Sequence, residues 1–259
     1  MFEVFTQIPP AILAFAFGVA LFAGFVKGAV GFALPMIMIS GLGSQLSPEL
    51  ALAALIVPTV AANLWQALRD GVAAALGTTR KYWLYMLIVL VFIAGSAQLV
   101  RVIPSWVFFL LLGLPITGFA LVQIFGWKLH IRPEHRTRAE LGIGAVAGFT
   151  GGLSGVWGPP TVAYLTAIDA PKGESMRMQG VVYAAGSIVL LTSHLRSGVL
   201  NAQTLPLSFA MLVPVVLGMV AGYSVHDRLD AVKFRRAMLV VLVVAGLNLI
   251  RRGVMGLLF

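Results

Sequence analysis

The feature that most constrains this chain is a series of apolar segments, each long enough or almost long enough to cross a lipid bilayer. A membrane-crossing helix needs about 20 consecutive apolar residues. Short polar breaks separate eight such segments, which cover residues 12–39, 50–68, 83–100, 106–124, 141–168, 178–195, 205–223 and 234–250. The sequence therefore predicts an all-α polytopic membrane protein with about eight transmembrane helices.

The composition excludes several other classes of protein. Of the 259 residues, 59% are hydrophobic and 10% are charged, whereas a soluble domain has about 45–50% apolar and about 25% charged residues. The formal net charge of +9 would point to nucleic acid in a soluble protein, but in a membrane protein it indicates topology or an anionic solute. The chain has no cysteine, and two of its four histidines lie in the polar central linker, so we expect no metal site and no cofactor. Because the basic residues are spread over short loops, we also expect no nucleic-acid partner. Because no basic residue precedes the first apolar segment, we expect that segment to be a retained helix rather than a cleaved signal peptide.

A polar linker at residues 126–140 divides the chain into two halves that match each other. The string GFVKGAVGFALP at 24–35 aligns with GFTGGLSGVWGP at 148–159, and LWQALRDGV at 64–72 aligns with LTSHLRSGV at 191–199. Residues 1–125 and 141–259 are therefore predicted to be two homologous four-span repeats. An even number of spans favours parallel repeats, whereas re-entrant folding of the glycine-rich segments would make the repeats inverted, and the sequence leaves this open.

The glycine-rich strings predict a broken helix at the start of each repeat, because Gly and Pro interrupt a membrane helix and leave backbone groups that lipid cannot satisfy. The N-terminus of a half-helix offers N–H groups and a positive dipole end to an anion. The alternative is close helix packing through small residues. The residues that we expect at a substrate site in these strings are Gly28, Gly31, Gly152, Ser154, Gly155, Trp157 and Gly158.

The pattern G-F-x-x-G-x-x-G-x-x-x-P in each half, followed by a helix that ends in L-R-x-G-V, resembles the TauE/SafE sulfite exporter family. The resemblance covers nearly the whole chain, including its two halves and its basic central linker. It implies a permease for sulfite or a small organosulfur anion, driven by an ion gradient, and no enzymatic activity.

Two cations are candidates for binding the anion. Lys27 lies inside the first glycine-rich string, and a charge in mid-membrane costs roughly 2.5–3.5 kcal/mol, so such a residue usually faces a cavity or a partner. Arg177 begins the sixth predicted span, and its guanidinium matches the oxygens of a sulfonate or sulfite. Alternatively, Lys27 extends its charge to the interface, and Arg177 forms an ion pair in its loop.

Polar residues near the ends of the second and sixth spans are further candidates. Gln66 aligns with Ser193, Asn63 lies one turn before Gln66, and His194 follows Ser193. His194 could carry a proton, because the ordinary pKa of histidine is about 6.5. The alternative is a helix-end histidine that bonds to carbonyl groups. Since no carboxylate lies deep in a predicted span, a proton that the substrate itself carries is favoured over a protein relay.

Two rival functions remain. A passive anion channel would have the same sequence features. An intramembrane serine protease would use Ser154 with His194, but the duplicated motif has Val30 and Ala67 at the matching positions of the first half, which a protease does not explain.

The location predicted for the chain is the plasma (inner) membrane, as a multi-pass protein. A small excess of Lys and Arg places both termini and the linker at 126–140 in the cytoplasm. The expected partners are the lipid bilayer and a small anion. A coupling ion and a homodimer are left open.

Overall fold

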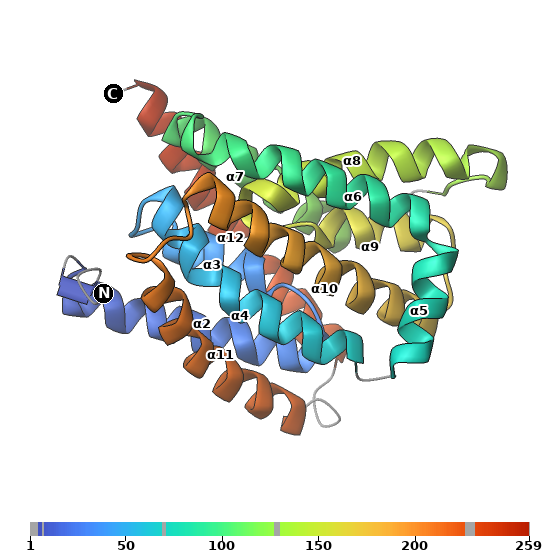
Figure 1. The fold of residues 1–259 in the computed structure, drawn as a ribbon, viewed down its shortest axis with the longest axis horizontal. Helices are drawn as coiled ribbons and strands as arrows, with labels where there is room; N and C mark the ends of the chain where they lie inside the picture. Colours follow the sequence, from blue (N-terminus) through green and yellow to red (C-terminus); the bar gives the residue numbers. More distant parts are fainter. Residues whose placement is uncertain (1–4, 7, 69–70, 127–129, 226–230, 259) are drawn as a thin grey trace.

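The computed structural model describes residues 5–6, 8–68, 71–126, 130–225 and 231–258. Arg69, which belongs to the matched motif of the first half, lies outside the described residues. Helices account for nearly all regular structure, and the part of the chain that the structure describes has no strand. The elements in chain order are α2 (Pro10–Val30), α3 (Leu34–Leu42), α4 (Pro48–Leu68), α5 (Val72–Lys81), α6 (Trp83–Ser96), η1 (Ala97–Arg101), α7 (Ser105–Ile124), η2 (Pro133–His135), α8 (Arg136–Ser154), α9 (Gly158–Ala167), α10 (Lys172–Ser197), α11 (Leu205–Val225) and α12 (Ala231–Leu258) (Figure 1).

Six helical segments among the described residues are long and apolar enough to cross a membrane. They are Pro10–Ala29, Pro48–Leu68, Trp83–Arg101, Ser105–Ile124, Gly173–Ser197 and Leu205–Ser224. Each overlaps one of the eight predicted spans. The predicted span at 141–168 forms two shorter helices, α8 and α9, and the predicted span at 234–250 lies within α12. The all-α prediction is confirmed, whereas a count of eight spans is not.

The polar segments contain more helix than the sequence predicted. Helix α5 was not predicted, and it begins directly after Gly71, whose φ of 85° is readily adopted by glycine. Helix α8 begins at Arg136, inside the linker predicted at 126–140. Nε of Arg136 lies 3.1 Å from Oε1 of Glu140, and such an i, i+4 ion pair supports the first turn of a helix.

Both glycine-rich strings break their helices. Gly31 follows α2 with a φ of 80°, and Gly155 follows α8 with a φ of 74°. Each N–H closes the last turn by donating to the carbonyl four residues earlier, that of Lys27 or Gly151. Glycine is favoured there because this left-handed conformation costs it little. The short helices α3 and α9 then begin on the far side of each break.

Two pairs of helices run in the same direction. In the α2–α11 pair, a Cβ on Gly24 would meet the backbone of Val215, and a Cβ on Gly28 would meet the backbone of Met219. Residue numbers therefore increase in the same direction along both helices. Along α8 and α6, Gly148 meets Val89 and Gly152 meets Ile93 in the same way. Glycine is needed at these positions because the backbones approach too closely for a side chain.

Two other pairs run in opposite directions. Along α4 and α10, Asn63 bonds to the backbone of Tyr183 while Gly180 packs on Ala67. Helices α7 and α12 pack extensively and are also antiparallel. If the halves are repeats, α2 corresponds to α8 and α6 corresponds to α11. The α2–α11 pair then corresponds to the α8–α6 pair, and the α4–α10 and α7–α12 pairs each join two corresponding helices. Antiparallel α4–α10 and α7–α12 pairs fit inverted repeats, although the two-repeat architecture itself stays a prediction.

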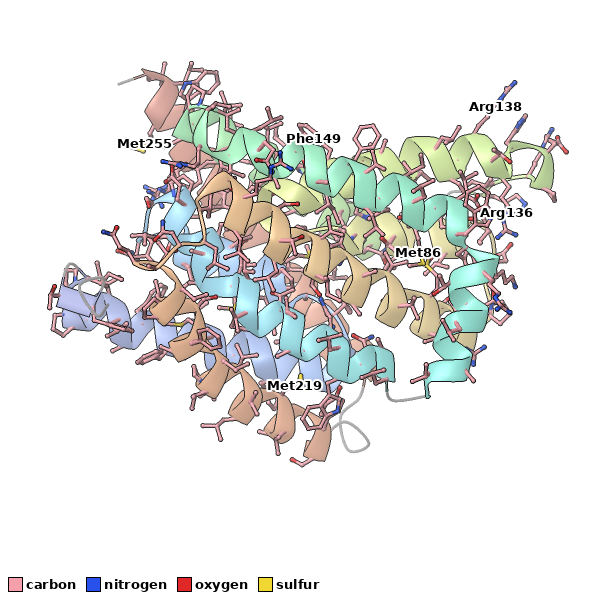
Figure 2. All side chains as sticks on the ribbon, viewed as in Figure 1. Met86, Arg136, Arg138, Phe149, Met219 and Met255 are labelled. Atoms are coloured by element: carbon pink, nitrogen blue, oxygen red, sulfur yellow. The ribbon has the colours of Figure 1, made fainter. Side chains whose placement is uncertain are left out.

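The ends of the helix bundle hold different parts of the chain. Both termini lie at one end, and the start of α8 lies at the other (Figure 1). Figure 2 shows Met255 at the first end and Arg136 and Arg138 at the second. The termini and the start of α8 therefore lie at opposite ends of the bundle, and the side of the membrane that each end faces stays a prediction.

Candidate functional site

The two helix breaks meet at a small cavity inside the bundle. A Cβ on Gly155 would lie 3.3 Å from Cβ of Pro35, so the breaks face each other. The cavity has a volume of about 20 Å³, which is room for about one water molecule. Its walls come from both breaks and from α2, α4 and α10: Lys27, Phe32, Ala33, Pro35, Met36, Asn63, Gly155, Val156, Trp157, Gly158 and Tyr183.

Lys27 is the charged residue of the cavity wall, and its side chain is only 2% exposed. The last turn of α2 brings its ammonium group to the first break. Nζ donates to the carbonyl of Gly31 at 3.1 Å, to Oδ1 of Asn63 at 2.8 Å and to Oε1 of Gln66 at 2.5 Å. These three acceptors match the three hydrogens of an ammonium group.

The hydrogen-bond partners of Lys27 are all neutral. Its Nζ also lies 5.5 Å from the centre of the Tyr183 ring. Among the described residues, no carboxylate forms an ion pair with it. A buried charge is normally paired, so the site has hydrogen bonds for the ammonium group but no protein anion to balance it.

Two half-helices begin at the cavity. Ala33 and Trp157 precede the first residues of α3 and α9, and both line the cavity. Pro35 in α3 and Pro159 in α9 stand near the helix starts, where a missing N–H is tolerated. The positive dipole ends of both helices therefore lie beside Lys27, and together they favour a negatively charged ligand.

The comparison with known families agrees with this electrostatic arrangement. The family model described as sulfite exporter TauE/SafE matches residues 16–249. The chain belongs to the TauE/SafE sulfite exporter family. Neither the search of curated proteins nor the search of solved structures gives a match. The TauE/SafE assignment makes this chain a multi-pass membrane transporter, which accounts for its apolar helices.

In this TauE/SafE protein, the predicted site residues divide into three groups. Lys27, Gly155, Trp157 and Gly158 line the cavity. Gly31 and Gln66 are not in the cavity wall, but each accepts a hydrogen bond from Lys27. The remaining six predicted residues, Gly28, Gly152, Ser154, Arg177, Ser193 and His194, are not part of the cavity wall.

Gly28 and Gly152 lie in helix interfaces. A Cβ on Gly28 would overlap the backbone carbonyl of Met219, and one on Gly152 would lie 2.5 Å from the carbonyl of Ile93. These glycines follow the packing alternative, because no side chain fits between the paired helices. Their position also explains why glycine spacing alone does not distinguish packing from binding.

Ser154 and His194 bond to separate backbone groups. The Ser154 hydroxyl donates to the Thr150 carbonyl at 2.7 Å. Nε2 of His194 lies 2.8 Å from the Gly152 carbonyl, and Nδ1 lies 3.2 Å from Oγ of Ser197. Because a carbonyl only accepts, Nε2 carries the hydrogen. The hydroxyl and the imidazole are thus engaged elsewhere, and the geometry gives no support to a Ser154–His194 protease pair.

Arg177 and Ser193 lie at other parts of the bundle. Arg177 is exposed near the start of α10. Ser193 is buried, and its carbonyl accepts a hydrogen bond of 3.4 Å from Nε2 of Gln98. Ser193 lines a separate pocket with Gln98 and Arg196, so its alignment with Gln66 did not identify a second residue beside Lys27.

Two further residues complete the site: Asn63, which was a candidate from the sequence, and Tyr183, which was not. Asn63 reaches Lys27 and also donates to the Tyr183 carbonyl at 3.2 Å. The Tyr183 ring covers the ammonium group and lies 6.4 Å from the Trp157 ring, between centres. The sequence feature that could have identified Tyr183 is a tyrosine inside an apolar span. The feature that indicates Asn63 is its spacing of one helix turn from Gln66.

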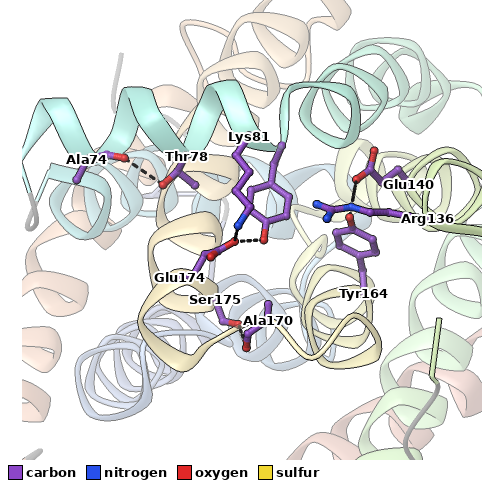
Figure 3. Close-up of polar contacts among 10 residues, drawn as sticks. Ala74, Thr78, Lys81, Arg136, Glu140, Tyr164, Ala170, Glu174 and Ser175 are labelled. Carbon is purple, nitrogen blue, oxygen red and sulfur yellow. Dashed lines mark hydrogen bonds and ion pairs between the residues drawn. The ribbon is translucent and has the colours of Figure 1, made fainter. Parts of the chain in front are cut away.

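A polar network closes the end of the bundle that holds the start of α8 (Figure 3). Glu174 of α10 pairs with Lys81 at 2.6 Å and accepts a hydrogen bond from Tyr82. Burial, and then the Glu174 carboxylate, raise the pKa of Tyr82 above its ordinary value. Glu140 of α8 accepts from Tyr164 of α9 at 2.6 Å. The Glu140–Tyr164 bond joins α8 to α9, and the Glu174 bonds join α10 to the end of α5 and to Tyr82.

Proposed function

We propose that this TauE/SafE protein is a secondary transporter of sulfite or a small organosulfur anion, with the cavity between the two breaks as its binding site. The observation that carries the proposal is the buried ammonium group of Lys27, which has three neutral acceptors and no carboxylate partner among the described residues. An anion that enters the cavity would balance this charge. In a site shielded from water, such a pairing is much stronger than at a surface.

The positions of the helix breaks support a transporter. Secondary transporters commonly bind substrate where broken helices from two repeats meet, and the half-helix N-termini point at anionic groups. In this chain the two breaks meet at the cavity, and the N-termini of α3 and α9 begin beside it. A rigid movement of one half against the other would then expose the same site to either side of the membrane.

The size of the cavity favours a compact substrate. With room for about one water molecule, the site is closed in this conformation, and a ligand enters only when neighbouring helices separate. A small tetrahedral or pyramidal oxyanion requires the least separation. Donor groups of the cavity wall, such as the indole N–H of Trp157, would orient its oxygens.

The experiment that tests the proposal is transport by purified protein in proteoliposomes. Sulfite, thiosulfate, sulfoacetate and sulfate are offered separately, with empty liposomes as the control. We expect saturable uptake of sulfite or one of the organosulfur anions. If none of the four is transported under any imposed ion gradient, the proposal fails.

Coupling separates the transporter from a passive channel. Among the residues that the structure describes, no Asp or Glu lies in the wall of the cavity, so they offer no carboxylate relay for protons there. We infer that any coupled proton travels on the substrate. A pH gradient should then drive accumulation of sulfite, a weak acid, but not of a sulfonate. Flux that only dissipates an anion gradient would instead identify a channel.

A further inference from the structure

Thr59 is a buried hydroxyl with no function in the site described above. Its side chain is 1% exposed, and Oγ1 has no hydrogen-bond partner in the structure. Threonines in helices commonly donate to the carbonyl four residues earlier. Thr150, Thr161 and Thr192 do so in this chain. A buried hydroxyl without a partner is destabilising, and the hydroxyl of Thr59 is therefore free to donate to a ligand that reaches it.

The position of Thr59 connects it to the cavity. It lies one turn from Asn63 on α4, and residues four apart share a helix face. On the antiparallel helix α10, Ser187 lies one turn from Tyr183 in the same direction, and its side chain is fully buried. Because Asn63 bonds to Tyr183, Thr59 and Ser187 lie at one level, one turn nearer the end of the bundle that holds the termini.

The backbone of α4 is also irregular at this turn. Pro58 stands inside the helix and cannot donate to the Ala54 carbonyl. The N–H of Val57 donates to Oγ of Ser208 on α11 at 3.1 Å. The turn of α4 before Thr59 therefore lacks one intrahelical hydrogen bond and is tied to α11 by another.

We propose that Thr59 contacts the transported anion on its path between the Lys27 cavity and the end of the bundle that holds the termini. The Thr59 O–H donates to an oxygen of the anion after that oxygen leaves Lys27. This inference rests on the proposed function, and it adds a second binding position to it. The ligand class is an oxyanion with a free acceptor oxygen.

The test compares Thr59→Val with Thr117→Val in sulfite uptake. Both substitutions remove a buried hydroxyl that has no partner, but Thr117 lies between α7 and α12, away from α4 and α10. Loss of a hydrogen bond to a charged ligand should raise the KM of Thr59→Val by roughly tenfold or more. Thr117→Val should keep the wild-type KM. Thr59→Ser, which retains the hydroxyl, should restore most of the affinity.

The outcomes separate this inference from the proposed function. If the wild type transports sulfite and Thr59→Val has an unchanged KM, Thr59 is not a contact and the inference is overturned. If Thr59→Val does not fold, Thr59→Ala and Thr59→Ser are compared in the same way, and equal KM values overturn it. A wild type that transports no anion overturns the proposed function and this inference together.

A second inference comes from the distribution of basic residues. Among the described side chains, six Lys or Arg residues lie at the end of the bundle that holds the start of α8: Arg80, Lys81, Arg132, Arg136, Arg138 and Arg177. At the end that holds the termini, the described residues include four: Arg101, Arg196, Arg251 and Arg252. Cytoplasmic loops of membrane proteins carry the excess of Lys and Arg.

We infer that the end with the start of α8 faces the cytoplasm and that both termini lie on the opposite side. The chain has no cysteine, so a single introduced thiol reports the side of its residue. Met255→Cys and Arg138→Cys both replace exposed residues, at opposite ends (Figure 2). In intact spheroplasts, an impermeant maleimide should label the Met255→Cys variant but not the Arg138→Cys variant. The Arg138→Cys variant should become labelled when the spheroplasts are lysed. The reverse pattern, or labelling of both in intact spheroplasts, overturns the inference.

Discussion

The ammonium group of Lys27 and the amide oxygen of Gln66 lie 2.5 Å apart, although 39 residues separate them in the chain. This bond joins the end of α2 to α4 directly beside the first helix break. Asn63 provides a parallel link at 2.8 Å. The charge that we expect to bind the anion is therefore held in place by two neutral amides, which leave its charge unbalanced.

Replacing Lys27 with methionine should abolish most anion transport. Lys27→Met keeps a long side chain but removes the charge, and hydrogen bonds to charged groups contribute about 1.5–3 kcal/mol. Loss of that binding free energy corresponds to roughly a ten- to hundredfold lower kcat/KM for sulfite. The measurement is sulfite uptake in proteoliposomes. Arg177→Ala removes an exposed cation outside the cavity wall and should transport normally. Equal activity of Lys27→Met and wild type would contradict the assigned role.

An internal carboxylate should compete with the substrate for Lys27. Asn63→Asp replaces an amide oxygen at 2.8 Å from Nζ with a negatively charged one of similar size. We expect a stable protein with little transport, because the charge of Lys27 would already be paired. Asn63→Ala should retain more transport than Asn63→Asp. The two variants are compared in uptake assays and in thermal unfolding, and the opposite ranking in uptake would be inconsistent with a site for an anion.

Gly28 should be important for stability rather than for affinity. The Cβ of Gly28→Ala would overlap the Met219 carbonyl, and such overpacking typically costs about 1–3 kcal/mol. We expect a lower unfolding temperature in detergent with an unchanged KM for the folded fraction. Gly18→Ala is the matched control on α2, since nothing lies within 4 Å of its Cβ position. If Gly28→Ala raises the KM without lowering the unfolding temperature, Gly28 contributes to binding and this prediction is wrong.

His194 should stabilise the second break without carrying the coupled proton. Its ring joins α10 to the Gly152 carbonyl at 2.8 Å, and leaving that buried carbonyl unsatisfied costs about 1–3 kcal/mol. His194→Ala should therefore unfold at a lower temperature and still respond to a pH gradient. The measurement is sulfite uptake at several imposed gradients, alongside thermal unfolding. Transport that persists but loses its pH dependence would identify His194 as the relay.

Much of the site could be predicted from local sequence. Gly31 and Gly155 mark the breaks because a left-handed backbone favours glycine wherever it occurs. Lys27 stands out because a charge inside an apolar span is costly without a cavity or partner. The family motif and the apolar segments were sufficient for the all-α, membrane-embedded class.

The tertiary structure alone decided which of these residues meet. Helices that are apolar on all sides do not indicate which face meets which neighbour, so the contacts of Tyr183 and Gln66 with Lys27 were not predictable. Gly28 and Gly31 belong to one motif, yet Gly28 packs against α11 and Gly31 supports Lys27. The sequence determines local conformation and membrane insertion through single-residue energetics. The direction and pairing of helices depend on contacts between distant segments, and they determine which residues form the cavity and which segments lie at the same end of the bundle.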